Sequence, residues 1–287
     1  MESRFKKIAI FSLIVLVITS CDKFEMRGFV RSYESADQRF KQSMDWNFNH
    51  PYKEITVPID EYSIFTMADS HVGGTENLDI FLRAAITENA AATVMVGDLT
   101  TGNTRDYMTF QDHLPTQDSL PSFQIIGNHD LYFDGWKQFY SQFGSTTYLF
   151  TVATPQASDL FIGLDTGGGT LGSDQLEWLK NILEYERPHY RKCILFTHNN
   201  LFRIRHTTST NPFVEEVHEL MELCVKHEID MVMTGHDHER NEVTFGNTIH
   251  ITMDALQDES ENAGYFKLNL LQGNIEYEFV DISQTNE

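Results

Sequence analysis

The chain has 287 residues, of which 41% are hydrophobic, and this length suits one large domain or two small ones. Lys and Arg number 21 against 42 Asp and Glu, so the formal net charge is −21. This balance argues against general nucleic-acid binding, because neutralising phosphates takes clustered cations.

The N-terminus is typical of a signal peptide. A basic start precedes an apolar run over residues 8–18, which is too short to span a bilayer. The run ends at Ile18-Thr19-Ser20-Cys21, which resembles a bacterial lipobox. We therefore expect residues 1–20 to be a lipoprotein signal peptide and Cys21 to carry a lipid. The lipid would anchor the protein to a membrane of the bacterial cell envelope. A plain secretory signal with a coincidental cysteine is the alternative.

Residues 21–56 are polar and mixed, which predicts a tether and an N-terminal extension, and one domain is expected over residues 57–287. Apolar residues at helical spacing predict helices over residues 76–88, with Thr75 as the cap, over 173–183, and from 211 to about 225. Predicted strands cover residues 62–68, 92–96, 123–126, 148–152, 160–164, 193–196, 231–233, 243–245, 248–252, 265–270 and 275–280. The pattern indicates an α/β protein with two packed sheets flanked by helices. Cys193 and Cys224 are expected to be buried thiols.

Five short polar clusters carry the functional information, because each follows the end of a predicted strand. They are Asp69-Ser70-His71, Gly97-Asp98, Gly127-Asn128-His129-Asp130, Thr197-His198-Asn199 and Gly235-His236-Asp237-His238. Taken singly, each has a structural alternative, such as a capped turn, a strand exit or a tight loop. Ligands of open α/β sheets lie beyond the carboxyl ends of the strands, so the clusters together predict one site.

The clusters offer seven metal-binding side chains and no cysteine: Asp69, His71, Asp98, Asn128, His198, His236 and His238. Mixed imidazole and carboxylate ligands suit Zn, Mn or Fe. Seven donors exceed what one ion needs when a position stays open for substrate, so we expect two divalent metal ions that share a bridging carboxylate. Two-metal sites stabilise the attacking and leaving oxygens of a phosphoryl displacement.

The pattern D-x-H, GD, GNH[D/E], H, GHxH over residues 63–254 resembles the calcineurin-like metallophosphoesterase family. The resemblance implies a four-layer α-β-β-α sandwich. It implies that Asp69, His71 and His238 hold the first metal. Asn128, His198 and His236 would hold the second, and Asp98 would bridge both, with a bridging water or hydroxide as nucleophile.

The resemblance also implies roles for the two residues that follow Asn128. His129 would be a catalytic imidazole that binds no metal, and would stabilise the transferring phosphoryl group or protonate the leaving oxygen. Asp130 would either orient that imidazole, as a second catalytic residue, or stabilise the loop as a structural carboxylate; both alternatives stay open.

Departures from the family pattern narrow the subfamily. Leu99-Thr100-Thr101-Gly102-Asn103 stands where phosphoprotein phosphatases have Asp-Arg-Gly after the GD motif. Purple acid phosphatases have a Tyr after that motif and lack D-x-H, and the lipid A-pathway pyrophosphatases usually have Arg at the position of His129. The remaining resemblance is to cyclic-nucleotide phosphodiesterases and to unspecific phosphodiesterases or phosphomonoesterases.

The expected function is therefore hydrolysis of a small-molecule phosphoester, as a phosphodiesterase or phosphomonoesterase of the cell envelope. Asn103, Arg203 and Arg205 are candidate substrate contacts, with an ordinary basic loop as the alternative for the two arginines. A nuclease of the same superfamily, or a non-catalytic envelope lipoprotein that keeps the fold, are the alternative functions.

Overall fold

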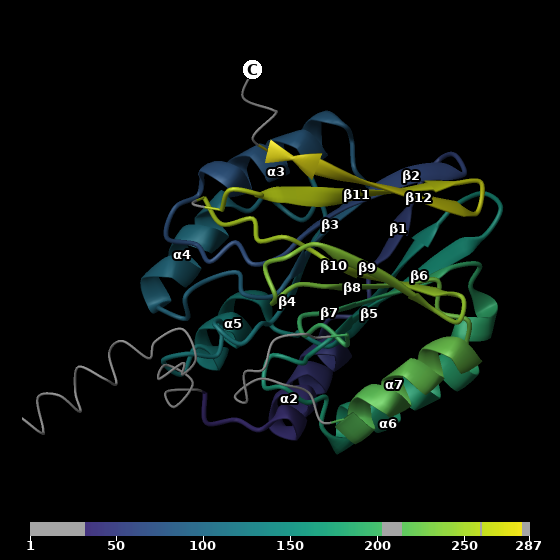
Figure 1. Ribbon diagram of the computed structural model, residues 1–287, viewed down its shortest axis with the longest axis horizontal. Helices are drawn as coiled ribbons and strands as arrows, with labels where there is room; N and C mark the ends of the chain where they lie inside the picture. Colours follow the sequence, from purple (N-terminus) through teal and green to yellow (C-terminus); the bar gives the residue numbers. More distant parts are fainter. Residues whose placement is uncertain (1–31, 203–213, 259, 283–287) are drawn as a thin grey trace, which may run out of the picture.

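Two β-sheets pack face to face in the computed structural model, which describes residues 32–202, 214–258 and 260–282 (Figure 1). The seven-stranded sheet has the order β1 (Glu54–Thr56), β5 (Tyr148–Ala153), β6 (Ser158–Leu164), β7 (Cys193–Thr197), β8 (Met231–Thr234), β10 (Thr248–Thr252) and β9 (Asn241–Phe245). The five-stranded sheet has the order β12 (Asn274–Asp281), β11 (Gly264–Leu271), β2 (Glu61–Met67), β3 (Ala92–Val96) and β4 (Ser122–Ile125).

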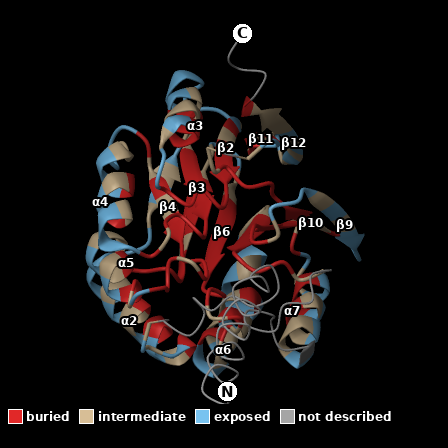
Figure 2. Ribbon diagram, turned by 60° about the vertical axis from the view of Figure 1, so that its left-hand side comes forward, coloured by how far each residue is buried: buried red, intermediate tan, exposed pale blue. Residues whose placement is uncertain are grey.

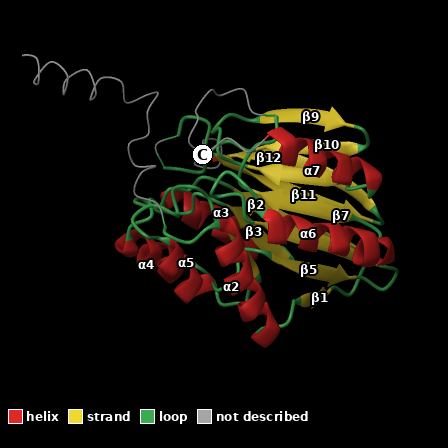
Figure 3. Cartoon of the chain, turned by 90° about the horizontal axis from the view of Figure 1, so that it is seen from below, coloured by secondary structure: helices red, strands yellow, loops and turns green. Residues whose placement is uncertain are grey.

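Helices cover the outer faces of both sheets (Figures 1 and 3). They are α2 (Ala36–Asn49), α3 (Glu76–Thr87), α4 (Thr104–His113), α5 (Trp136–Phe143), α6 (Ser173–Asn181) and α7 (Val214–Lys226). A π-helical turn, Ile182–Glu186, and a 3-10 turn, Arg187–His189, follow α6. The layers are thus helix, sheet, sheet, helix, which confirms the expected four-layer sandwich.

The alternation of side chains along each strand produces these layers. In β3, Val94 and Val96 face the core between the sheets, whereas Met95 faces the core under α3, α4 and α5. In β7, Phe196 faces the inter-sheet core and Leu195 faces the core under α6 and α7. Strands that are buried on both faces have continuous apolar sequences. Figure 2 shows such buried strands at the centre of the molecule.

The parallel strands point the same way, which positions the polar clusters. Strands β2, β3 and β4 are parallel to one another, as are β6, β7, β8 and β10. The predicted strands are confirmed to within about two residues at each end. The sequence analysis did not predict α4 and α5. Both are short and bury few residues: Tyr107 and Phe110 in α4, and Trp136 and Phe139 in α5.

Three local features refine the predictions. Thr75 makes no side-chain capping bond; instead the Asp258 carboxylate accepts hydrogen bonds from the first backbone N–H groups of α3, at 2.9 and 3.2 Å. Ile86, expected on the inner face of this helix, lies in its last turn and is 52% exposed. Cys193 and Cys224 are buried free thiols, as predicted.

The stretch expected to be tether and extension is ordered structure from residue 32 onward. Helix α2 begins with a capping box between Ser35 and Gln38, and β1 pairs with β5 at the edge of the larger sheet. The Arg39 guanidinium forms a buried ion pair with Asp165, at 2.7 Å, which ties α2 to the end of β6. These residues therefore belong to the folded body, although their sequence is polar.

The predicted signal peptide and Cys21 lie outside the described residues. In the part of the chain that is described, none of the helices combines the length and the apolar character needed to cross a membrane.

Candidate metal centre

The loops that follow the strands bring the predicted metal ligands together in two groups. Asp69, His71, Asp98 and His238 form one group, and Asp98, His198 and His236 form the other. Within each group the ligand atoms all lie within 4.8 Å of one another. Asp98 belongs to both, so a single carboxylate stands between two places where an ion can bind.

In the first group, two imidazoles and a carboxylate converge. His238 Nε2 lies 3.2 Å from Asp69 Oδ1 and 3.2 Å from His71 Nε2. His71 Nε2 lies 3.8 Å from Asp98 Oδ2. Asp69 Oδ1 is fully buried, and the His238 imidazole nitrogen lies within hydrogen-bonding distance of it. Imidazole nitrogens that converge on buried carboxylate oxygens are what a cation would bind, so these residues fit a metal ion.

In the second group, His198 is the centre of the contacts. Its Nε2 lies 3.3 Å from Asp98 Oδ2, 3.2 Å from Asn128 Oδ1 and 3.2 Å from His236 Nδ1. Its Nδ1 lies 3.0 Å from the carbonyl oxygen of Val96, which can only accept. Nδ1 therefore carries a proton, and Nε2 is the atom directed at the site. Asn128, a predicted ligand, thus places its amide oxygen beside this group.

Several predicted ligands in these loops have a left-handed backbone conformation. Among the described residues, ten that are not glycine have positive φ, and half of them are predicted ligands: Asp69, His71, Asp98, His236 and His238. Such conformations cost free energy outside glycine and cluster at functional sites. The site therefore stores backbone strain that the surrounding fold sustains.

Close backbone approach explains the glycines of the motifs. A Cβ on Gly127 would overlap the backbone nitrogen and a carboxylate oxygen of Asp98. A Cβ on Gly235 would overlap a carboxylate oxygen of Asp69, which accepts the His236 backbone N–H at 2.8 Å. Glycine at both positions lets one loop pack against the ligand of another.

Charge coupling sets the protonation of the ligands. Burial by itself raises the pKa of Asp98, but His198 and His129 outweigh it and hold that pKa well below its usual range. Burial lowers the pKa of His71 to about 4, so this imidazole is neutral and ready to bind a cation. Burial also lowers the pKa of His198, but Asp98 and Asp69 outweigh it and raise that pKa to about 10. A metal must therefore displace a proton from His198, which couples binding to pH.

His129 contributes no ligand atom to either group, yet it borders both. Its backbone N–H donates to Asp98 Oδ1 at 2.7 Å, and its Nε2 lies 3.9 Å from Asp98 Oδ2. Its ring contacts those of His71, at 4.5 Å, and Tyr132, at 4.7 Å. The side chain is 22% exposed, unlike the fully buried His198. An imidazole held beside the metal ligands and open to solvent is placed to meet a substrate.

Asp130 holds the loops together. Its carboxylate accepts the backbone N–H groups of Leu99, Thr100 and Gly127, at 3.1, 2.8 and 2.9 Å, and the Thr100 hydroxyl at 3.0 Å. These bonds join the GD loop to the GNHD loop and engage both oxygens. They support the loop-stabilising alternative for Asp130 over the alternative in which it orients the His129 imidazole.

The candidate substrate contacts are less well defined. Asn103 is exposed just before α4 and donates to the Thr101 hydroxyl at 2.7 Å. Arg203 and Arg205 lie outside the described residues. The sequence analysis missed Tyr132, whose ring packs on His129 and whose hydroxyl lies 3.4 Å from the Asn128 amide nitrogen. Its position four residues after the ligand Asn128, in the same loop, was the available signal.

The family model for calcineurin-like phosphoesterases matches residues 62–240. The chain belongs to this family. Calcineurin-like phosphoesterases are metal-dependent phosphoester hydrolases, and in this member the two ligand groups around Asp98 form a dinuclear site for divalent metals. No curated protein matches the sequence.

Solved structures share the fold of this phosphoesterase at low sequence identity. A dimetal phosphatase from Danio rerio is 12% identical, with a TM-score of 0.62 over 78% of this chain and 97% of that one. GAP50, the anchor in the inner membrane complex of Plasmodium, is 13% identical, with a TM-score of 0.58 over 77% and 84%. A putative 5′-nucleotidase from Staphylococcus aureus is 13% identical, with a TM-score of 0.52 over 77% and 53%.

Proposed function

We propose that this phosphoesterase hydrolyses small-molecule phosphodiesters or phosphomonoesters with two ions of Mn, Fe or Zn. The observation that carries the proposal is the position of Asp98, which is shared by both ligand groups. When bound, such a pair of ions lowers the pKa of a water and offsets the charge of phosphoryl oxygens. A non-catalytic scaffold has no use for a converging set of ligands with a strained backbone around a shared carboxylate.

The residues of the chain would position the reacting groups. Asp69, His71 and His238 would hold one ion, Asn128, His198 and His236 the other, and Asp98 both. Asn128 ligates without adding negative charge, which keeps the site attractive to an anionic phosphoester. His129, fixed by its backbone bond to Asp98, would donate a hydrogen bond to a phosphoryl oxygen or a proton to the leaving oxygen.

Activity of the full chain, purified and supplied with Mn²⁺, tests the proposal. We expect hydrolysis of bis(p-nitrophenyl) phosphate, p-nitrophenyl phosphate or both. Asp98→Ala is expected to abolish the activity while the circular dichroism spectrum is retained. Asp118→Ala, which changes an exposed carboxylate outside the site, is the matched control. An Asp98→Ala variant with the wild-type rate would overturn the assignment.

Two comparisons refine the substrate class and the metals. Single-stranded DNA at physiological salt serves as the nuclease substrate, and faster turnover of DNA than of both aryl esters would favour the nuclease alternative. Reconstitution with Mn²⁺, Fe²⁺ or Zn²⁺ in turn identifies the ion that supports the highest rate.

We further propose that a lipid on Cys21 anchors the protein in the bacterial cell envelope. The support is the sequence alone: a basic start, a short apolar run and Ile18-Thr19-Ser20-Cys21. We expect Cys21→Ser to move the protein from the membrane fraction to the soluble fraction. Continued membrane association of this variant would refute the lipid anchor and leave the phosphoesterase proposal untouched.

A further inference from the structure

Tyr132 lies in the GNHD loop, four residues after Asn128. Two consecutive turns fold this part of the loop back on itself. The Leu131 backbone N–H donates to the Asn128 carbonyl at 3.3 Å, and the Tyr132 backbone N–H donates to the His129 carbonyl at 3.0 Å. The Tyr132 side chain is buried, with 1% of its residue surface exposed. Because a buried tyrosine has both a ring and a polar hydroxyl to accommodate, its neighbours indicate its role.

The Tyr132 hydroxyl lies at the side-chain amide of Asn128. Asn128 Nδ2 donates to this hydroxyl at 3.4 Å, and Asn128 Oδ1 lies 3.2 Å from His198 Nε2 in the second ligand group. The two ends of the amide therefore meet different partners. An amide rotated by 180° would present N–H groups to the ligand group, and N–H groups cannot bind a cation. By accepting from Nδ2, the hydroxyl favours the orientation in which the oxygen is available as a ligand.

The Tyr132 ring contacts the imidazole that follows Asn128 in the chain. The ring centroids of Tyr132 and His129 are 4.7 Å apart, with planes at 49°. The His129 ring also contacts that of His71, with centroids 4.5 Å apart and planes at 82°. Neighbouring rings at these distances restrict the side-chain torsion angles of His129. The imidazole is therefore held beside Asp98, although 22% of its side chain is exposed.

The GD loop fixes the backbone that carries Tyr132. Gly102 of that loop has a φ of +87°, and a Cβ there would lie 2.6 Å from the His129 carbonyl oxygen and 2.9 Å from Tyr132 Cβ. On the same turn, the Tyr107 hydroxyl donates to the Asp130 carbonyl at 2.7 Å. The turn is thus held by residues that are not ligands, so Tyr132 can set the positions of its two neighbours.

We propose that Tyr132 is a positioning residue that serves metal binding and catalysis together. Its hydroxyl directs the Asn128 amide oxygen at the second metal, and its ring holds the His129 imidazole in place to meet the substrate. The proposal rests on the phosphoesterase function and deepens it, because it assigns the side chain that orients both residues. Tyr132 acts only through these two neighbours.

Titration of the full chain with Mn²⁺ in competition with a chelator tests the role of the hydroxyl. Tyr132→Phe keeps the ring and removes the acceptor of Asn128 Nδ2. We therefore expect one of the two stepwise Mn²⁺ affinities to fall about three- to tenfold, the loss of roughly one hydrogen bond.

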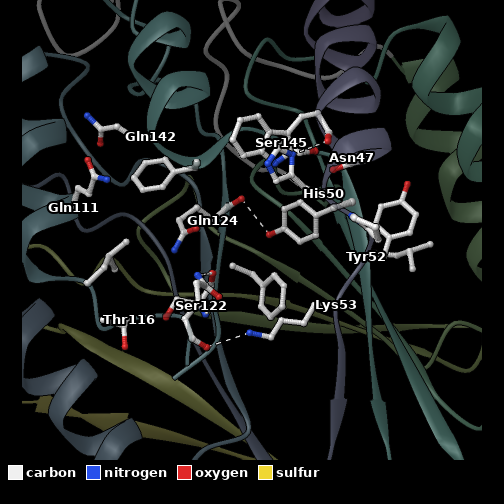
Figure 4. Close-up of a pocket in the computed structure, with 18 of the residues that line it drawn as sticks. Asn47, His50, Tyr52, Lys53, Gln111, Thr116, Ser122, Gln124, Gln142 and Ser145 are labelled. Carbon is white, nitrogen blue, oxygen red and sulfur yellow. Dashed lines mark hydrogen bonds between the residues drawn. The ribbon is translucent and has the colours of Figure 1, made fainter. Parts of the chain in front are cut away.

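Tyr148→Phe is the matched control for this titration. Tyr148 is also buried, and its hydroxyl donates to the Gln124 carbonyl at 3.1 Å, beside the cavity in Figure 4. Among the described residues that line this cavity, there is no predicted metal ligand. We expect Tyr148→Phe to bind both ions like wild type. Equal Mn²⁺ affinities of Tyr132→Phe and Tyr148→Phe would overturn the proposal.

A double-mutant cycle tests the role of the ring. Tyr132→Leu removes the ring, so its kcat should be at least about tenfold lower than that of Tyr132→Phe, because the imidazole loses its fixed orientation. In the His129→Ala background, the same two variants should differ less than about twofold, since no imidazole is left to orient. An equal ratio in both backgrounds would show a merely structural role and overturn the proposal.

The two measurements distinguish this proposal from the phosphoesterase function. A wild-type chain that hydrolyses no phosphoester would refute the function, and the Mn²⁺ titration would still decide whether Tyr132 acts on Asn128. If Tyr132→Leu fails to fold, Tyr132→Phe keeps the ring and decides the proposal by its Mn²⁺ affinities.

Discussion

Replacing His129 with alanine separates catalysis from metal binding. The imidazole supplies no ligand atom to either metal group, and its Nε2 stands 3.9 Å from Asp98 Oδ2. We therefore expect metal content to be retained and kcat to fall by about 10²–10⁴, the usual contribution of a positioned acid or hydrogen-bond donor. This corresponds to about 3–5 kcal/mol of transition-state stabilisation. KM should change little, because the interaction strengthens in the transition state.

Two measurements carry this test. Metal content is determined by mass spectrometry of the purified His129→Ala variant. Steady-state rates are then compared for aryl esters with p-nitrophenol and with the more basic phenol as leaving group. If His129 protonates the leaving oxygen, the phenyl ester loses more rate than the p-nitrophenyl ester; if it stabilises the phosphoryl group, both lose equally.

A matched histidine supplies the control. His189 is exposed on the turn after α6, and His189→Ala should keep the wild-type rate. Loss of metal from His129→Ala, or an unchanged kcat, would refute the reasoning from geometry.

Three further perturbations probe the fold and the site. Arg39→Met leaves the buried Asp165 carboxylate without its ion-pair partner, so we expect chemical denaturation to show a free energy of unfolding lower by about 3–5 kcal/mol. An unchanged free energy of unfolding would mean that α2 is not part of the cooperative unit. Burial lowers the pKa of His250 from 6.5 to about 4. As the pH falls, the unfolded state therefore binds a proton at this histidine before the folded state does. The free energy of unfolding should drop by roughly 3 kcal/mol between pH 6.5 and 4. His250→Leu should remove that part of the pH dependence, and an unchanged pH profile would show that the side chain is solvated. Gly127→Ala pushes a methyl group into Asp98 and should lower the metal affinity, measured by competition with a chelator, at least about tenfold. Gly73→Ala is the control, because a methyl group has space there and the affinity should stay unchanged. Equal affinities of the two variants would contradict the close approach of Gly127 to Asp98.

The strands and the metal ligands could be predicted because both have local signals. Apolar runs such as residues 92–96 are strands buried on both faces, and the polar residue after each run lies at the end where parallel strands meet. Seven donors for one site implied two ions, and the shared position of Asp98 agrees with that count.

Other parts of the structure have no local signal. Helix α2 is polar in sequence and is held by Arg39 and Asp165, which are 126 residues apart. Asp258 caps α3 from a distance of 181 residues, in place of the adjacent Thr75. The role of Asp130 depends on which backbone groups surround it, and this follows from the packing of two loops.

The amino-acid sequence by itself determined the family, the sandwich and the candidate ligand residues, because strand periodicity and ligand chemistry are properties of neighbouring positions. Only the tertiary structure decided that Asp130 ties two loops together, that Asp258 caps α3 and that Arg39 pairs with Asp165. These relations join segments far apart in the chain. They depend on how the two sheets and their helices pack, for which no single stretch of sequence carries a pattern.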